Sequence, residues 1–284
     1  MSTAVAYRNR DPHFSVLQIP RWRANLYQFL SVEVWGNLPS SWQRALSKRY
    51  TSIYDQPFSK KWISPYISYY YSNKNYLDGF KPPHGKDDYE NFQDFFIREF
   101  KYMPENNSDW VWPCEGLLCD AGIVGRKSNS SVKGDRRNLD TIFGLTENSL
   151  PGSYYFSNVF LHNKNYHRIH APISGTITHI QHIPGDLVIL RPWIYVSDPS
   201  LPAFRNERIN IDIEDVQGQT WYLSIVGGPA VGTIEIPASI VVGATVGKLQ
   251  ELALFYLGST CCMAAPFPPR HHKKNAFVDI GTSY

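Results

Sequence analysis

Two histidines stand three residues apart in the segment YHRIHAP, residues 166–172. Imidazole is the side-chain group best suited to moving protons near neutral pH, so His167 and His170 are candidates for acid–base chemistry. The same spacing is compatible with a structural role or with a metal-binding pair. No third histidine or carboxylate stands at a familiar zinc spacing, so we expect no metal site. The structural and the acid–base interpretations both stay open.

A glycine directly precedes a serine in the segment LGST, residues 257–260. By itself this pattern is typical of a turn between two elements. It also permits a reaction in which the hydroxyl of Ser259 attacks the carbonyl of Gly258, because glycine can adopt the strained backbone geometry that the attack requires. Such an attack needs a base for the hydroxyl proton and donors for the oxyanion.

Two other segments contain residue types that could assist such a reaction. The glycine-rich segment GGPAVG, residues 227–232, permits close backbone approach and can direct N–H groups into a site, although a tight connection between strands is the simpler explanation. It is not a phosphate loop, because no Lys-Ser/Thr pair follows it. Glu115, within WPCEG at residues 112–116, could orient a histidine or could simply cap a turn.

Helices are expected in the first third of the chain. Pro20 suits a first helical position, and the apolar residues that follow it recur on one helical face. These residues are Trp22, Leu26, Phe29, Leu30 and Val34. Residues 39–41, Pro-Ser-Ser, predict the start of a second helix with Leu46, Tyr50 and Ile53 on one side. Residues 88–100 predict a further short amphipathic helix.

From Val111 onward, short β-branched runs alternate with turn residues, which predicts a β-rich body. The expected strands are Gly116–Ile123, Gly175–Ile183, Leu187–Leu190, Ile209–Ile213, Trp221–Val226, Gly232–Ile236, Ile240–Val246 and Leu252–Leu257. Helices followed by strands indicate the α+β class. We expect a helical, aromatic-rich segment at residues 1–87 and a catalytic body at residues 88–284.

Composition excludes several classes of protein. Of 284 residues, 43% are apolar and 19% are charged, as in globular domains rather than disordered chains or coiled coils. Four cysteines are too few for a disulfide-built scaffold. No apolar stretch approaches the roughly 18 residues of a membrane-spanning helix, and the first residues lack the apolar core of a signal peptide.

Charge is distributed unevenly along the chain. The net charge of +3 is too small to indicate a nucleic-acid partner. Residues 1–61, however, hold nine Lys/Arg against three Asp/Glu, a net charge of +6. A basic segment rich in Trp and Tyr could lie on an anionic membrane surface, or it could be a solvated helical face.

Taken together and in chain order, these segments resemble the phosphatidylserine decarboxylase family of pyruvoyl-dependent enzymes. The matching segments are NFQDFFIREF (91–100), WPCEG (112–116), VKG (132–134), YHRIHAP (166–172), PGDL (184–187), NER (206–208), residues 227–234 and ELALFYLGST (251–260). The resemblance spans about residues 88–265, whereas residues 1–87 show no match.

The resemblance implies an enzyme that cuts its own chain between Gly258 and Ser259. In the family, the serine forms an ester with the preceding carbonyl, and elimination and hydrolysis leave a pyruvoyl cofactor on the short fragment. The pyruvoyl ketone forms a Schiff base with an amino-acid amine, and CO2 is lost. Carried over to this chain, the resemblance implies that His170 is the base of the cutting reaction and that Glu115 orients it. It implies that His167 is the proton donor during decarboxylation.

The glycine-rich segment is expected to bind the substrate or the oxyanion through Gly228, Val231 and Gly232. One catalytic position departs from the family pattern, because Glu115 stands where the family has Asp. The extra methylene moves the carboxylate by about 1 Å, and such a displacement can cost on the order of 100-fold in rate. Asp120 is an alternative acid.

Three functions fit the sequence. The first is decarboxylation of phosphatidylserine to phosphatidylethanolamine, with peripheral contact to a membrane. The second is decarboxylation of a free aromatic amino acid such as tryptophan, and the third is a non-catalytic protein that stays uncut. The expected partners are therefore a phospholipid or an amino acid and no nucleic acid. We expect a cytoplasmic location, free or peripheral to a membrane, and homo-oligomerisation stays open.

Overall fold

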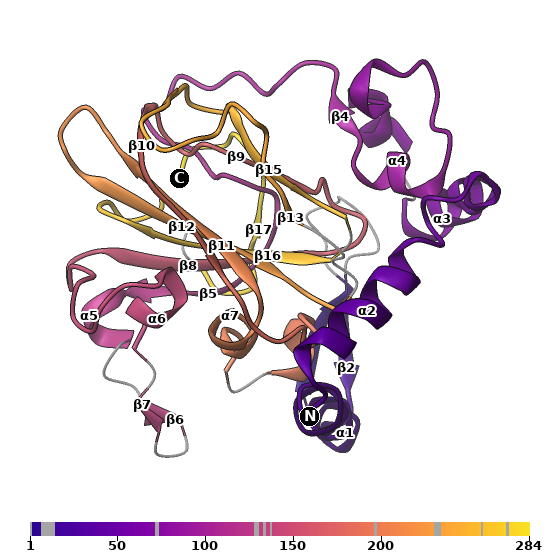
Figure 1. Ribbon diagram of the computed structural model, residues 1–284, viewed down its shortest axis with the longest axis horizontal. Helices are drawn as coiled ribbons and strands as arrows, with labels where there is room; N and C mark the ends of the chain where they lie inside the picture. The colour runs from indigo at the N-terminus through magenta and orange to yellow at the C-terminus, as the bar shows by residue number, and fades with distance from the viewer. Residues whose placement is uncertain are drawn as a thin grey trace.

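The computed structural model describes residues 2–6, 15–71, 74–127, 131–132, 135–136, 138–195, 198–229, 234–256, 258–270 and 273–284. Figure 1 shows the N-terminal helices in succession along one side of a large sheet. Neighbouring strands of that sheet are antiparallel. The expected α+β class is therefore confirmed.

The N-terminal part of the chain is mostly helical. Its elements are β1 (Ser2–Ala6), β2 (Ser15–Ile19), α1 (Arg21–Phe29), the π-helical η1 (Leu30–Trp35), α2 (Ser40–Thr51), the 3₁₀ segment η2 (Pro57–Trp62), α3 (Ile63–Tyr70), the 3₁₀ segments η3 (Lys74–Gly79) and η4 (Pro83–Gly85), β3 (Phe80–Lys81), α4 (Phe92–Phe96) and β4 (Glu99–Phe100).

The rest of the chain is mostly strand. Its elements are β5 (Gly116–Ile123), α5 (Val124–Lys127), β6 (Ser131–Val132), β7 (Asp135–Arg136), α6 (Asp140–Phe143), β8 (Tyr155–Leu161), β9 (Arg168–His170), β10 (Gly175–Ile183), the 3₁₀ segment η5 (Pro192–Ile194), α7 (Leu201–Arg205), β11 (Arg208–Glu214), β12 (Thr220–Gly227), β13 (Ile234–Glu235), β14 (Thr245–Val246), β15 (Glu251–Phe255), β16 (Ser259–Ala265) and β17 (Phe277–Val278).

Two sheets enclose the main core. The large sheet has the order β14-β10-β11-β12-β16-β8-β5-β17, and a three-stranded sheet has the order β13-β15-β9. Buried side chains from both sheets belong to one cluster, which includes Ile169 and Phe255 from the small sheet and Leu223 and Met263 from the large one. Burial of this apolar surface is the main favourable contribution to folding. Strand β16 lies inside the large sheet, between β12 and β8.

Most of the expected strands are present, and two important ones were missed. Strands β5 and β10 have the predicted bounds. Strands β8 and β16 were not predicted. The sequence of β16, Ser-Thr-Cys-Cys-Met-Ala-Ala, does not alternate between polar and apolar residues, because all seven residues are buried. It also contains few β-branched residues, so neither signal of a strand was present. The predicted helix at 88–100 is only the five-residue α4, capped at its start by the side chain of Asn91.

The predicted strand Leu187–Leu190 is instead an extended segment that binds side chains. The amide of Leu187 donates to Gln43 Oε1 at 2.8 Å, and the amide of Ile189 donates to Ser31 Oγ at 2.9 Å. Both acceptors lie on the N-terminal helices. Side chains thus take the place of a partner strand, and these buried polar contacts fasten the helices to the body.

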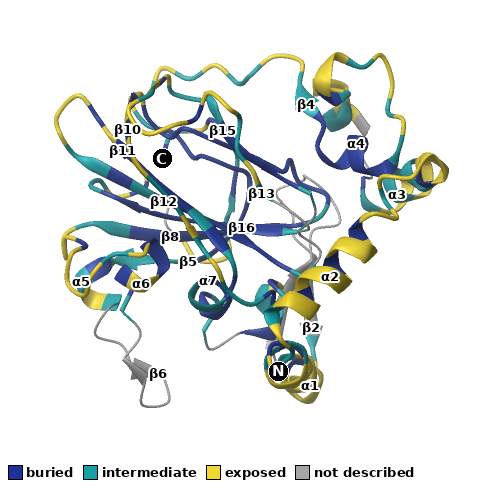
Figure 2. Ribbon diagram, viewed as in Figure 1, coloured by how far each residue is buried: buried dark blue, intermediate teal, exposed yellow. Residues whose placement is uncertain are grey.

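The apolar faces of α1 and α2 point away from the body, and Figure 2 shows the exposed residues of these helices in yellow. Trp22 is 68% exposed and Trp42 is 64% exposed, whereas Gln43 is fully buried. This is the reverse of an ordinary surface helix, whose apolar stripe faces the core. Within the part of the chain that the structure describes, no helix is both long enough and apolar enough to cross a bilayer.

Candidate functional site

Ser259 begins the buried strand β16, directly after a glycine in a left-handed conformation. Gly258 has φ = +58°, a region that residues with a Cβ rarely occupy. Ser259 is fully buried, and its Oγ has no hydrogen-bond partner among the described residues. A buried hydroxyl without a partner is unfavourable, and such a group is a candidate for a chemical role.

The first two residues of the glycine-rich segment, Gly227 and Gly228, lie near Ser259 and the Gly258 carbonyl. Gly227 faces Ser259 across the β12–β16 ladder. A Cβ at Gly228 would lie 3.5 Å from the Gly258 carbonyl oxygen and 2.7 Å from Leu190 Cδ1, so a side chain here would clash. The other two predicted residues, Val231 and Gly232, lie outside the described residues.

The carboxylate of Glu115 is held by three donors. Its Oε1 accepts hydrogen bonds from Tyr76 Oη at 2.7 Å, the Tyr166 amide at 3.0 Å and Asn165 Nδ2 at 3.2 Å. Glu115 is fully buried, directly before β5. A buried carboxylate needs such donors, because removal from water otherwise makes its charge very costly.

His167 is connected to this carboxylate through Asn165. Its Nδ1 hydrogen-bonds the Asn165 carbonyl at 2.8 Å, which places the ring proton on Nδ1 and leaves a lone pair on Nε2. Nε2 is buried and lacks a hydrogen-bond partner among the described residues. Burial lowers the pKa of His167 to about 3, so the ring is neutral near pH 7. Glu115 thus fixes residue 165, and residue 165 fixes His167.

The same part of the backbone brings His167 close to Ser259. The backbone of Leu161 is near enough to His167 to affect its pKa. Leu161 faces Ser259 across the β8–β16 ladder. The buried hydroxyl of Ser259 and the buried imidazole of His167 therefore both lie near Leu161, and neither Ser259 Oγ nor His167 Nε2 has a hydrogen-bond partner among the described residues.

His170 is held elsewhere, and the expected hydrogen bond between Glu115 and His170 is not formed. The Nδ1 of His170 hydrogen-bonds the Leu249 carbonyl at 2.7 Å, and its Nε2 lies 3.0 Å from Tyr166 Oη. Both ring nitrogens are therefore occupied. Glu115 binds instead at residues 165 and 166, and residues 167 and 170 lie roughly 10 Å apart along an extended chain. Asp120, the alternative acid, pairs with Lys127 and accepts from Ser200 Oγ at 3.0 Å.

Three residues of this site were missed by sequence analysis. Lys164 and Asn165 directly precede the predicted histidine segment, and this position was their signal in the sequence. Both polar side chains are buried in the structure. Burial lowers the pKa of Lys164 to about 7, and Glu115 acts against this shift. Tyr76 gave no local signal, because it lies in a tyrosine-rich stretch and reaches Glu115 only through the fold.

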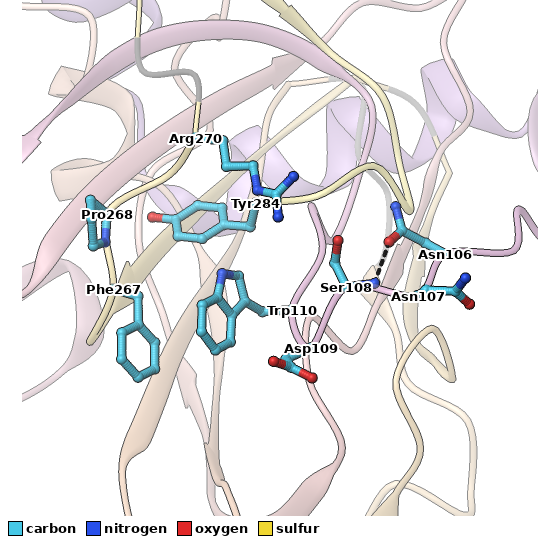
Figure 3. A pocket seen from close by; sticks show the side chains of 9 residues that line it. All are labelled: Asn106, Asn107, Ser108, Asp109, Trp110, Phe267, Pro268, Arg270 and Tyr284. Carbon is cyan, nitrogen blue, oxygen red and sulfur yellow. Dashed lines mark hydrogen bonds between the residues drawn. The ribbon is translucent and has the colours of Figure 1, made fainter.

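A cavity of about 530 Å³ lies far from these residues. Figure 3 shows its lining, in which the rings of Trp110 and Phe267 stack 4.4 Å apart beside Arg270 and Tyr284. Phe267 lies just beyond the C-terminal end of β16, whereas Ser259 is the first residue of that strand. The two ends of this strand are roughly 20 Å apart, so the cavity is not part of the candidate site.

Comparison with known proteins shows that this chain is similar to the members of one family. The model of a family described as phosphatidylserine decarboxylase matches residues 92–283. The phosphatidylserine decarboxylase proenzyme of Dechloromonas aromatica (strain RCB) is 30% identical over 200 residues, covering 63% of this chain and 70% of that protein. The proenzyme of the same name from Variovorax paradoxus (strain S110) is 30% identical over 203 residues, covering 64% and 70%.

Proposed function

Because the chain belongs to the phosphatidylserine decarboxylase family, a family of carboxy-lyases, we propose that it is a proenzyme that cuts itself between Gly258 and Ser259. The cut converts Ser259 into a pyruvoyl cofactor. The single observation that carries the proposal is the buried Oγ of Ser259, which has no hydrogen-bond partner among the described residues and directly follows a left-handed glycine. The relatives' printed name, which includes the word proenzyme, adds support.

The first step is attack of Ser259 Oγ on the carbonyl carbon of Gly258. A new C–O bond forms, and the C–N bond between the two residues breaks. His167 Nε2 takes the hydroxyl proton and returns it to the departing nitrogen of Ser259. This direction of transfer is supported by the Nδ1 contact, which keeps the lone pair on Nε2. The result is an ester between the Gly258 carbonyl and the Ser259 side chain.

Glu115 and Gly228 assist this step in different ways. Glu115 stabilises the loop conformation that fixes His167, because it binds the Asn165 side chain and the Tyr166 amide. Gly228 lies beside the carbonyl under attack, and a side chain at this position would clash with Leu190. Elimination across the Cα–Cβ bond of Ser259 then releases the Gly258 carboxylate, and hydrolysis releases ammonia and completes the cofactor.

When formed, the pyruvoyl ketone captures an amino-acid amine and accepts the electrons that CO2 leaves behind. We propose that His167 Nε2 also takes a proton from the ammonium group of the substrate and delivers it to the product carbon, since both ring nitrogens of His170 are occupied. We propose that His170 acts indirectly. It anchors the Tyr166 side chain, and the Tyr166 backbone binds Glu115.

We propose phosphatidylserine in an anionic membrane as the substrate. The proposal is supported by the names of the relatives and by the outward apolar faces of the N-terminal helices. Exposed basic residues surround these faces, including Arg21, Arg23, Lys48, Arg49 and Lys61. Apolar side chains with neighbouring cations are the combination that binds the interface of an anionic bilayer.

Mass spectrometry of the purified protein tests the cut. Under denaturing conditions we expect two fragments, residues 1–258 and a pyruvoyl-capped 259–284. Under native conditions we expect one complex of both, because β16 pairs on both sides with strands of the long fragment. A single full-length species would overturn the proposal and favour an uncut, non-catalytic family member.

Decarboxylation of a free aromatic amino acid is the second candidate function. One observation favours it, namely an aromatic wall over the loop at residues 162–165. The Tyr70 ring is tilted against His162 with ring centroids 5.6 Å apart, and Tyr71 Oη donates to the Lys164 carbonyl. Release of CO2 from free tryptophan, with none from phosphatidylserine vesicles, would establish this alternative.

A further inference from the structure

The buried carboxylate of Glu115 depends on a residue that lies outside the segment matched by the family model. Of the three donors to Oε1, Tyr76 Oη is the closest, at 2.7 Å. The other two donors, Asn165 and Tyr166, belong to the matched residues 92–283, whereas Tyr76 belongs to η3. The N-terminal segment therefore reaches directly into the candidate site.

Tyr76 also connects Glu115 to a buried cation. Arg98 Nη2 donates to Tyr76 Oη at 3.3 Å, so the tyrosine oxygen accepts from the guanidinium while its proton goes to the carboxylate. Arg98 is 1% exposed. A hydroxyl between a cation and an anion makes two charge-assisted hydrogen bonds, which are stronger and more directional than neutral ones.

The ring of Tyr76 is held in place by its neighbours. It stacks on Tyr71, with ring centroids 5.8 Å apart, and meets the edge of Phe80 at 4.8 Å. Because the ring is already held by this packing, forming the hydrogen bond to Glu115 restricts the Tyr76 side chain little further. Glutamate has one more rotatable bond than aspartate, so the position of its carboxylate depends more on such contacts.

We propose that Tyr76 is a positioning residue that holds the Glu115 carboxylate in place, so that the N-terminal segment completes the self-cleavage site. This inference rests on the proposed function. Tyr76 acts through Glu115, Asn165 and the Tyr166 amide on the orientation of His167. A displacement of about 1 Å along this series of contacts is enough to cost on the order of 100-fold in rate.

The rate of self-cleavage in Tyr76→Phe tests the inference, measured as the fraction of cut chain against time in freshly synthesised protein. We expect cleavage to be about 10- to 100-fold slower, because a hydrogen bond to a charged group is lost while the ring stays. Tyr66→Phe is the matched control. The Tyr66 hydroxyl is buried in the same aromatic cluster and lacks a hydrogen-bond partner among the described residues, so its removal should change the rate less than about twofold.

Repeating the Tyr76→Phe substitution in a Glu115→Asp variant shows whether the Tyr76 hydroxyl positions the carboxylate or the residue only packs. In Glu115→Asp the carboxylate is withdrawn by about 1 Å from the Tyr76 hydroxyl. Adding Tyr76→Phe to this variant should then slow cleavage less than about threefold, because the lost contact was already weakened. If Tyr76 only packs, the hydroxyl deletion slows both backgrounds by the same factor.

The outcomes distinguish the inference from the function on which it rests. An uncut wild-type chain overturns both. A cut wild-type chain, with Tyr76→Phe as fast as Tyr66→Phe or equally slow in both backgrounds, overturns the inference alone. If Glu115→Asp does not cut at all, the cleavage rates of Tyr76→Phe and Tyr66→Phe decide. Melting temperatures of the same two substitutions, measured in Ser259→Ala precursors that cannot cut, show whether the two variants are equally stable.

Discussion

The body and the N-terminal helices place polar and apolar residues in opposite ways. The body buries charged and titratable groups, among them Arg98, Glu115 and His167. The helices α1, η1 and α2 bury Ser31 and Gln43 and expose Trp22 and Trp42. Burying charge and exposing apolar surface both cost stability in water, so both arrangements call for a functional explanation. The first fits chemistry in a dry site, and the second fits contact with a non-aqueous surface.

The largest effect is expected from Ser259→Ala, which removes the nucleophile of the body. We expect one full-length species in denaturing mass spectrometry and no decarboxylation, because no ester can form. Membrane binding by the N-terminal helices should be unchanged in this variant, which tests whether the two regions act separately. Normal fragments from Ser259→Ala would disprove the assigned cleavage site.

The two histidines of the body should differ strongly. His167→Ala should slow cleavage by at least about 100-fold, since general-base catalysis contributes on the order of 100- to 10,000-fold. His170→Ala removes only the anchor of Tyr166, so we expect an effect below about tenfold. The fraction of cut chain over time measures both. The reverse order would restore the sequence-based assignment, in which His170 is the base.

The outward tryptophans provide the corresponding test of the helices. Replacing Trp22 and Trp42 together by serine should weaken binding to phosphatidylserine-containing vesicles by about 10- to 100-fold, given the apolar area that each ring buries. Vesicle co-sedimentation measures the effect.

The control for that experiment lies on the body. Tyr102 and Val216 are each 88% exposed, and serine at both positions should leave vesicle binding within about twofold of the wild type. Equal loss in the two double variants would refute a specific docking face on α1 and α2.

A further expected effect is a dependence of stability on pH that arises in the body. Burial lowers the pKa of His162 and His167 to about 3 and that of His170 to about 4. Between these values and the ordinary histidine pKa near 6.5, the unfolded chain binds more protons than the folded one, so stability falls as the pH falls. At pH 5 each histidine costs on the order of 2 kcal/mol relative to pH 7.

Denaturant unfolding of the Ser259→Ala precursor at both pH values measures this cost without interference from cleavage. His179 and His182 are exposed, so alanine at these two positions should leave the pH dependence in place. Equal unfolding free energies at pH 5 and pH 7 would contradict the buried, neutral state of the three histidines.

The family, the fold class and the candidate residues follow from the amino-acid sequence alone. These candidates are Ser259, His167, His170 and Glu115. The sequence is sufficient because these residues stand in short local segments whose order along the chain carries the information. It also determined that α1 and α2 are helical and amphipathic, since periodicity is a local property.

Only the tertiary structure decided which of these groups meet and which way the helices face. Strand pairing of β8 with β16 brings Leu161 to Ser259, and a loop carries Asn165 between Glu115 and His167. No local rule links Tyr76 to Glu115, which are 39 positions apart. Hydrogen bonds of this kind depend on packing between distant segments, and local propensity contains no information about such packing.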